Sequence, residues 1–531
     1  MDFQSLSMLA DAVRGVDLKA LAAEPGRADG FVWSAPHLEV DVVKQPLNAQ
    51  AMDALLELSK AQGLDAAKDR LFAGDIVNGS ENRPALHWAL RGGAEHLPQA
   101  EVFRTQAAAA TAFAEKARSG GLGFDLKSIL HIGIGGSDLG PRLIWDALRP
   151  LGPDRGSNAV NLSFCANVDP EDFMEAAEDL DPATTLVIVV SKSFKTPETQ
   201  SNAILAREWL VAHLGEGAAD AHLAAVSSAP DLAKAWGAAQ DRIFPMDEAV
   251  GGRYSVWSSV GLSLEIALGG DVWRRFLSGA SEMDAHFKDA PLAENVPARL
   301  AMMDVWLHTF LDVPSRVVLS YAHRLRKLAD FLQQLEMESN GKSIPAGDAE
   351  IAVETAPVTW GSVGTIGQHS FHQLLHQGTR RFAPEFVFAL NAGGADKDRG
   401  RALLANALAQ AEAMLMGRSS DEARAQLQAK GVGADTVEAR APHMHMPGGR
   451  GATMIALNDL SPESVGALIA LYEHRTFAGG VLWGVNPFDQ WGVERGKVLA
   501  EEIDQALSGA DAGARDPSTV RLIDKVRAAR G

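Results

Sequence analysis

The amino-acid sequence predicts an α/β protein with two doubly wound parallel sheets, wrapped by helices at both ends of the chain. Short apolar runs of strand length alternate with helical stretches from about Ser128 onward. A second alternating series begins near Pro314. Because uninterrupted apolar strands are typical of parallel sheets covered on both faces, each series predicts one such sheet.

The predicted segments divide the chain into five parts. Residues 1–102 are expected to form a helical segment that packs on the second α/β domain, because QAMDALLELSKAQGLDAAKDRLFAG has apolar residues at helical spacing and ENRPALHWALRGG ends in a glycine pair that suits a helix stop. The remaining parts are a first α/β domain (103–270), a helical connection (271–311), a second α/β domain (312–490) and a helical tail (491–531).

Within each domain, predicted strands and helices follow one another in order. In the first domain the strand candidates are SILHIGIGG, NLSFCANVD, TTLVIVVS and AHLAAVS, and the helices include LGPRLIWDAL and PETQSNAILAREWLVAHL. In the second domain the strand candidates are PSRVVLSYA, EFVFALNA and ATMIALNDL, and the helices include HSFHQLLHQG and SPESVGALIALYEHRTF. A polar, weakly ordered end is expected after Leu507.

Composition narrows the classes of function. The net charge is −19, so long-range repulsion makes nucleic acid an unexpected partner, and an anionic substrate needs a site that concentrates positive charge and helix N-termini. The single cysteine, Cys165, excludes an intrachain disulfide and a Cys-rich metal site. Since neither a secretory signal nor an apolar run of about 18 residues occurs, the protein is expected in the cytoplasm, without a membrane partner.

A glycine-rich loop, GIGGSDLG, begins at Gly133 between a predicted strand and a predicted helix. Glycines there let backbone N–H groups approach a bound anion, and the helix N-terminus adds its dipole. A dinucleotide fingerprint needs a third glycine where Asp138 stands, which disfavours that interpretation. A tight turn with close helix packing is the other alternative.

A second loop, SKSFKTPET, follows the strand TTLVIVV. Pro197 suits the first position of the next helix, with Thr196 as its N-cap. The hydroxyls and lysines of this loop are those of Ser191, Ser193, Thr196, Lys192 and Lys195. Small hydroxyls at a helix N-terminus predict a phosphate-binding loop, and an ordinary capped helix with solvated lysines is the alternative.

Two further segments carry groups suited to proton transfer beside a carbonyl. In GGRYSVW, two glycines precede Arg253, so the backbone can bring a guanidinium close to a developing oxyanion. A buried structural arginine paired with a carboxylate is the alternative. In QQLEMESNGKS, Glu336 and Glu338 offer a carboxylate base for a carbon-bound proton, or else a solvated helix end.

Three histidines in GQHSFHQLLHQG have the spacing of one helix face: His369, His372 and His376. Catalysis is one interpretation, and a face of packed, hydrogen-bonded histidines is another. A metal site needs a further carboxylate, and the H-E-x-x-H spacing is absent. The HMH run at 443–445 raises the same metal question and is expected in an exposed turn.

The segment NPFDQWGVERGK places Gln490 and Lys497 seven residues apart. If the segment is helical, both side chains lie on one face. A salt-bridged surface lysine is the alternative.

Taken together, these motifs resemble the glucose-6-phosphate isomerase family. GIGGSDLGP, SKSFKTPET, GGRYSVWS, MESNGK, GQHSFHQLLHQGT and FDQWGVERGK occur in that family's order, and the resemblance runs from about Asp75 to Ala500. It implies two sugar-isomerase α/β sandwich domains and a homodimer, with no metal or other cofactor. The implied reaction is the reversible conversion of glucose-6-phosphate to fructose-6-phosphate by ring opening and proton transfer through an enediolate.

The resemblance also assigns residues by motif. Glu338 would move the proton between C1 and C2, and His369 would help open the ring in the partner subunit's site. Arg253 would lie near the enediolate oxygen, and Lys497 completes the implied catalytic set. The residues implied to bind the substrate are Gly136, Ser137, Ser191, Lys192, Ser193, Thr196, Gln334 and Gln490.

Some positions depart from the family's usual residues, among them Leu335, Lys195 and Pro197, but none removes an implied catalytic residue. Four alternatives stay open: another hexose-phosphate isomerase or epimerase, a non-enzymatic sugar-phosphate sensor, a nucleotide-dependent oxidoreductase and a metal isomerase. A sensor has no need of Glu338, His369 and Lys497 together, which favours an enzyme.

Overall fold

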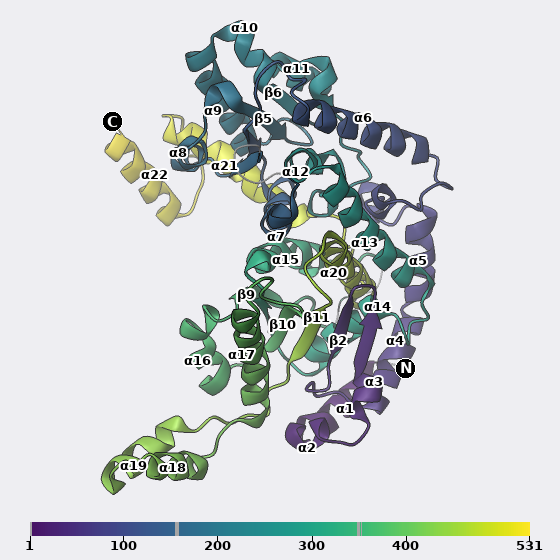
Figure 1. The fold of residues 1–531 in the computed structure, drawn as a ribbon, viewed down its shortest axis with the longest axis vertical. Coiled ribbons are helices and arrows are strands. Elements are labelled where there is room, and N and C mark those ends of the chain that lie inside the picture. Colours follow the sequence, from purple (N-terminus) through teal and green to yellow (C-terminus); the bar gives the residue numbers. More distant parts are fainter. Residues whose placement is uncertain (1–2, 154–158, 348–350, 352, 531) are drawn as a thin grey trace. The chain divides into compact units, whose positions relative to one another are not determined.

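The computed structural model describes residues 3–153, 159–347, 351 and 353–530. It consists of two compact units, Met1–Pro487 and Phe488–Gly531. The first unit contains both predicted sheets, and the helices and strands of each unit can be followed in Figure 1. The α/β class with two doubly wound sheets is confirmed.

The first sheet has five strands, all parallel, in the order β4-β3-β5-β6-β7. The strands are β3 (Ser128–Ile132), β4 (Asn161–Cys165), β5 (Thr185–Val190), β6 (Leu223–Val226) and β7 (Ile243–Phe244). The first four lie within the predicted runs. A two-residue strand such as β7 shows no periodicity, so the sequence did not reveal it.

Helices cover both faces of this sheet. They are α6 (Ala100–Arg118), α7 (Leu139–Leu148), α8 (Pro170–Ala177), α9 (Pro197–Leu214), α10 (Glu216–Ala219), α11 (Pro230–Trp236) and α12 (Leu262–Leu268). Because side chains alternate along a strand, Leu130 and Ile132 of β3 pack with Leu210 of α9 in one core, whereas His131 meets Ser263 of α12 on the other face.

The second sheet has the order β1-β2-β11-β10-β8-β9. Its strands are β1 (Val32–Ala35), β2 (Leu38–Asp41), β8 (Ser315–Tyr321), β9 (Val358–Val363), β10 (Ala383–Ala389) and β11 (Thr453–Leu457). Strands β8, β9, β10 and β11 pair with one another in parallel. Of these four, β8, β10 and β11 were predicted. The expectation of only helices and loops before residue 102 is wrong, because β1 and β2 form an antiparallel hairpin that pairs with β11. Strand β2 does alternate between apolar and polar residues (LEVD), a signal that the helical interpretation of this segment overlooked.

Helices also enclose the second sheet. On one face Leu319 and Phe386 pack with α16 (His372–Gln377) and α17 (Lys397–Met416), and on the other, polar contacts join the sheet to α14 (Val296–Asp304) and α20 (Pro462–Trp483). The remaining helices of this unit are α1 (Phe3–Arg14), α2 (Leu18–Ala22), α3 (Arg27–Phe31), α4 (Ala49–Ala61), α5 (Leu64–Ala73), α13 (Gly270–Asp289), α15 (Leu328–Leu332), α18 (Ser420–Ala429) and α19 (Ala434–Arg440).

The second unit contains α21 (Glu494–Leu507) and α22 (Pro517–Arg530). Arg527 of α22 donates from Nε to the carbonyl of Ala506 at 2.7 Å, and Ile523 is buried. The weakly ordered end expected after Leu507 is therefore wrong for α22. The five-part division of the chain stays a prediction. Across the described residues, every helix is too short or too polar to cross a membrane.

Candidate active site

The glycine-rich turn after β3 is joined to the loop that carries Arg253. A Cβ placed on Gly136 would lie 2.0 Å from the carbonyl oxygen of Gly252, so only glycine lets the two backbones approach this closely. Gly135 has φ of +60°, a conformation that also favours glycine. These glycines explain how two loops 116 residues apart meet.

His131 stabilises the same glycine-rich turn through hydrogen bonds. Its Nε2–H donates to the carbonyl oxygen of Ser137 at 2.7 Å, and its Nδ1 lies 2.8 Å from the hydroxyl of Ser263. Complete burial lowers the pKa of His131 to about 4. The imidazole is therefore neutral at pH 7 and acts as a fixed donor.

Arg253 is buried behind this turn and held on two sides. Its Nε donates to the hydroxyl of Ser339 at 2.6 Å, and one terminal nitrogen donates to the carbonyl of Pro487 at 2.7 Å. The hydroxyl of Tyr254 lies 3.0 Å from the same Ser339 oxygen. The other terminal nitrogen lies 3.5 Å from a carboxylate oxygen of Glu338, so the guanidinium has a fixed orientation.

Glu338 is the last residue of a π-helical turn, Gln333–Glu338, which continues α15. Its side chain is 21% exposed, and its Oε2 is buried without a hydrogen bond to any described residue. Glu336 lies in the same turn, but its carboxylate accepts hydrogen bonds from Arg316 and Thr359 within the protein. Of the two candidate carboxylates, only Glu338 is available to a ligand, and the turn is no solvated helix end. π-helical turns of this kind are frequent at functional sites.

Gln334 lies in the same π-helical turn and touches the glycine-rich loop. A Cβ on Gly135 would come within 3.1 Å of its Nε2. The structure thus brings together residues from three of the motifs. They are Gly136 and Ser137 from the glycine-rich loop, Arg253 from GGRYSVW, and Gln334 and Glu338 from QQLEMESNGKS. Ser339 and Tyr254 were not among the predicted site residues, although each directly follows one of them.

The SKSFKTPET loop lies at the carboxyl end of β5, next to β3 in the sheet. Helix α9 begins at Pro197 with Thr196 as its N-cap residue, as predicted, but the Thr196 side chain makes no capping hydrogen bond. The hydroxyl of Ser191 is buried and has no hydrogen-bond partner among the described residues. Two hydroxyls are therefore left for a ligand at a helix N-terminus.

The other polar residues of this loop are engaged within the protein. The hydroxyl of Ser193 accepts from the backbone N–H of Lys195 at 3.2 Å. The ammonium of Lys192 donates to the carbonyl of Glu248 at 3.1 Å and lies 3.2 Å from its carboxylate. Lys192 is thus held by an acidic neighbour in this structure.

The three candidate histidines do not form one catalytic face. His369 ends a 3₁₀ turn, Gly367–His369, and is exposed, whereas α16 begins only at His372. The rings of His372 and His376 both donate to Oε1 of Gln410, at 3.0 and 2.7 Å. The interpretation of packed, hydrogen-bonded histidines is therefore right for these two. Among the described residues, no cluster of His, Cys, Asp or Glu is arranged to hold a metal ion.

Gln490 and Lys497 belong to the second unit. Gln490 precedes a 3₁₀ turn, Trp491–Val493, and α21 begins at Glu494, so the two side chains do not share one helix as the spacing suggested. Lys497 lies 2.7 Å from the carboxylate of Glu494 and is 61% exposed. Within its own unit it is thus a salt-bridged surface lysine.

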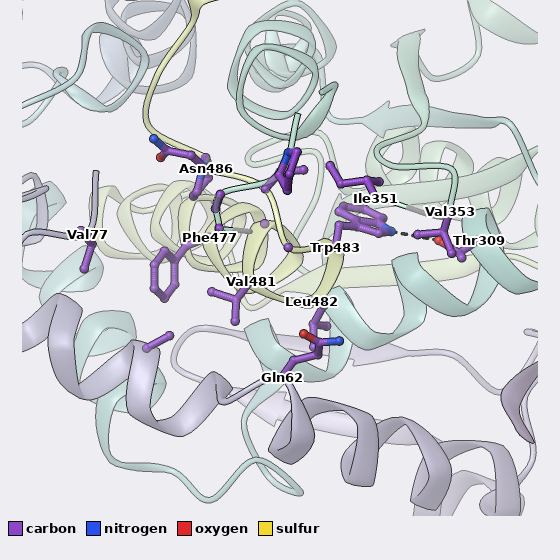
Figure 2. A pocket seen from close by; sticks show the side chains of 18 of the residues that line it. Gln62, Val77, Thr309, Ile351, Val353, Phe477, Val481, Leu482, Trp483 and Asn486 are labelled. Carbon is purple, nitrogen blue, oxygen red and sulfur yellow. Dashed lines mark hydrogen bonds between the residues drawn. The ribbon is translucent and has the colours of Figure 1, made fainter. Parts of the chain in front are cut away.

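A cavity of about 820 Å³ is lined in part by Pro487, whose carbonyl accepts a hydrogen bond from Arg253. Figure 2 shows Val77, Phe477, Val481 and Trp483 around it, with the indole of Trp483 bonded to Thr309. Within the described part of the chain, none of the candidate residues lines this cavity. Its apolar wall differs in character from the polar site at Arg253.

Comparison with known proteins gives a consistent result. A sequence model of the family described as phosphoglucose isomerase matches residues 41–523. A glucose-6-phosphate isomerase of Caulobacter sp. (strain K31) is 46% identical over 518 residues, which cover 95% of each chain. A glucose-6-phosphate isomerase of Brucella ovis is 43% identical over 526 residues, covering 96% of this chain and 94% of the relative.

Solved structures agree with the sequence matches. The crystal structure of a glucose-6-phosphate isomerase from Chlamydia trachomatis superposes with a TM-score of 0.85 at 31% identity, covering 99% of both chains. A protein from Thermus thermophilus gives a TM-score of 0.66 at 26% identity, covering 88% of this chain and 99% of the other.

Proposed function

Because the chain belongs to the phosphoglucose isomerase family, we propose that it catalyses the reversible isomerisation of glucose-6-phosphate to fructose-6-phosphate. It is an aldose–ketose isomerase, an intramolecular oxidoreductase of carbohydrate metabolism. The observation that carries this proposal is the juxtaposition of Glu338, whose Oε2 has no hydrogen bond to the described residues, and a buried guanidinium, Arg253, beside a glycine-rich turn.

The reaction moves one proton between adjacent carbons of the open-chain sugar. We assign Glu338 as the base that removes the proton from C2 and returns it to C1, because its carboxylate oxygen is available while Glu336 is not. The intermediate carries negative charge on oxygen. The guanidinium of Arg253 is held by Ser339 and Pro487, so it supplies a cation that needs no reorganisation when that charge develops.

The Ser191 and Thr196 hydroxyls are proposed to bind the phosphate at the N-terminus of α9. The Ser191 hydroxyl supports this role, because it is buried without a partner among the described residues, which is unfavourable until a ligand provides one. The Thr196 hydroxyl supports it because it makes no capping bond. Ser193 and Lys192 are proposed to add contacts, with Lys192 exchanging Glu248 for the ligand. Gly136, Ser137, Gln334 and Gln490 are proposed to bind the sugar.

We further propose that the active form is a homodimer in which His369 opens the sugar ring in the partner subunit's site. The support is the exposed position of His369 on the turn after β9. Its backbone N–H donates to the carbonyl of Ile366, but its imidazole makes no hydrogen bond to the described residues of its own chain. Lys497 is proposed to complete the catalytic set, and the cytoplasm is proposed as the place of the reaction.

A direct assay tests the reaction. Purified protein is given fructose-6-phosphate in the presence of a chelator and without added cofactor, and glucose-6-phosphate is measured. Turnover is expected at rates typical of enzymes, roughly 1–10³ per second. A panel of other hexose phosphates distinguishes a different isomerase on the same fold, and no turnover with either glucose-6-phosphate or fructose-6-phosphate contradicts the proposal.

A subunit-exchange experiment tests the shared site. Inactive Glu338→Gln subunits are mixed with inactive His369→Ala subunits under conditions of verified exchange. A mixed dimer then has one site with both changes and one with neither, so about a quarter of the wild-type activity should return, since about half of the dimers are mixed under two-fold symmetry. If exchange is confirmed by mass and no activity returns, His369 serves its own chain.

A further inference from the structure

Helix α20 carries four consecutive polar residues in a largely buried helix: Tyr472, Glu473, His474 and Arg475, here called the α20 tetrad. Each is less than 5% exposed. Successive helix positions differ by about 100° in direction, so the tetrad points to more than one side. Its bonds follow two separate routes, and each route ends beside one member of the Glu338–Arg253 pair.

The first route leads to the π-helical turn. Arg475 binds both carboxylate oxygens of Asp304 at 2.7 Å, and Asp304 in turn contacts Arg316. Arg316 then pairs with Glu336 at 2.5 Å. Glu336 lies two residues before Glu338 in the same turn and also accepts a bond of 2.6 Å from the hydroxyl of Thr359.

A second branch ties the same route to the sheet. Arg475 also binds Glu385 of β10 at 2.7 Å, and the hydroxyl of Tyr472 donates to the other oxygen of Glu385. The charged groups of this route are all buried, so replacing a single partner leaves an uncompensated charge. The π-helical turn is therefore fixed to both α20 and the second sheet.

The second route leads to the Arg253 loop. Glu473 accepts a bond of 2.8 Å from the indole N–H of Trp257, four residues after Arg253. Its other oxygen binds Arg91, whose guanidinium lies over the Trp257 ring at 4.1 Å. Asp284 joins Arg91 to His474 and completes the cluster.

We propose that the α20 tetrad sets the spacing of Glu338 and Arg253, with Glu336 and Glu473 as positioning residues for the isomerisation. The inference rests on the proposed function, but its structural part does not depend on it. Glu336 fixes the turn that presents Glu338, and Glu473 fixes the segment that presents Arg253. One helix thereby holds both halves of the reacting pair in register, where a misplacement of about 1 Å costs on the order of 10²-fold in rate.

The test compares kcat and KM in Glu336→Gln, Glu473→Gln and the milder Thr359→Val. For the two glutamine variants we expect kcat to fall about 10-fold or more, with KM within about two-fold, because the phosphate-binding loop is untouched. Thr359→Val removes one hydrogen bond to Glu336 with little change of volume, so it should fold even if Glu336→Gln does not. It should lower kcat about three-fold.

Two controls separate positioning from general stability. Thr359→Ser keeps the hydroxyl and should retain the wild-type kcat. Glu265→Gln changes another buried glutamate, which bonds Thr111 on α6, and should lower the melting temperature without lowering kcat. The proposal is overturned if Thr359→Val retains the wild-type kcat, or if Glu265→Gln lowers kcat as much as Glu473→Gln does.

Crystal structures of the variants give a readout that needs no activity. The separation of Glu338 Oε2 and the nearest Arg253 nitrogen, 3.5 Å here, should lengthen in Glu473→Gln and in Thr359→Val. An unchanged separation in both contradicts the positioning role, even if the wild-type protein has another substrate. Conversely, if the wild type does not turn over either hexose phosphate, the proposed function is refuted. The Glu338–Arg253 separation in the variants still tests the positioning role in that case.

Discussion

The loop after β5 and the Glu338–Arg253 pair differ in how much of their hydrogen bonding is already satisfied. At the loop, the Ser191 hydroxyl has no partner among the described residues and the Thr196 hydroxyl caps nothing. At the pair, Arg253 is bonded on two sides and lies against a carboxylate. On the proposed function, the loop gains its hydrogen bonds when the phosphate binds, whereas the guanidinium of Arg253 is oriented before the substrate arrives.

The largest expected effect on the rate comes from replacing Glu338. In Glu338→Gln the carboxylate base is lost while shape and volume are kept, so kcat should fall by about 10²–10⁴-fold with KM little changed. Steady-state kinetics in both directions measure this, and the melting temperature checks the fold. A change in kcat under about three-fold would mean that the proton is moved by another group.

Substitutions in the SKSFKTPET loop should change KM more than kcat. Ser191→Ala and Thr196→Ala each remove a bond to a charged phosphate, worth about 1.5–3 kcal/mol, so KM should rise roughly 10- to 100-fold with a smaller effect on kcat. Inhibition by inorganic phosphate should weaken in parallel.

A matched control lies at the other end of the same strand. The hydroxyl of Thr185 donates to the carbonyl of Asp181 at 2.8 Å, so Thr185→Val removes a hydroxyl from β5 without touching the loop. Its KM and its phosphate inhibition should stay near those of the wild type. If phosphate inhibition is unchanged in Ser191→Ala and Thr196→Ala, the anion binds elsewhere.

The last effect concerns the stability of the buried cluster around Asp284 and not the rate. Burial raises the pKa of Asp284 from 3.8 to about 7, against the opposing influence of Arg91. The folded state therefore keeps a proton that the unfolded chain releases above about pH 4, and this stabilisation is complete below that pH and is lost as pH rises toward 7.

Asp284→Asn removes that titration. The melting temperature of the wild type relative to the variant should therefore decline between about pH 4 and pH 7, measured by calorimetry at constant ionic strength. A parallel pair of curves would show that Asp284 is ionised throughout, held by Arg91 and His474.

Local patterns predicted much of the fold and part of the site. Helix α9 begins and ends where the sequence predicted, because proline marks its first residue and Gly215 follows its last. The motifs likewise named Arg253 and Glu338, whose side chains lie 3.5 Å apart, while their catalytic roles stay a proposal. What they could not reveal depends on contacts far apart in sequence, such as the approach of Gly136 to Gly252 and the burial of Glu336 against Arg316.

The same limit explains the missed strands and the ambiguous histidines. Strand β2 pairs with β11, which lies far away in the sequence, so no local signal announces that partner. His372 and His376 look like possible ligands until Gln410, on another helix, is seen to accept from both. Spacing alone places side chains on a face, but it does not say what that face meets.

The hairpin at the start of the chain has a consequence for synthesis. Val40 of β2 pairs with Ile455 of β11, a separation of 415 residues. At about 5–20 residues per second, the ribosome delivers the partner strand roughly 20–80 s after the hairpin itself. During that interval the hairpin presents an unpaired edge, the kind of surface that promotes association between nascent chains. Fast translation and chaperones that shield strand edges should therefore raise the yield of folded protein, whereas a circular permutant that starts just before β11 should depend on them less.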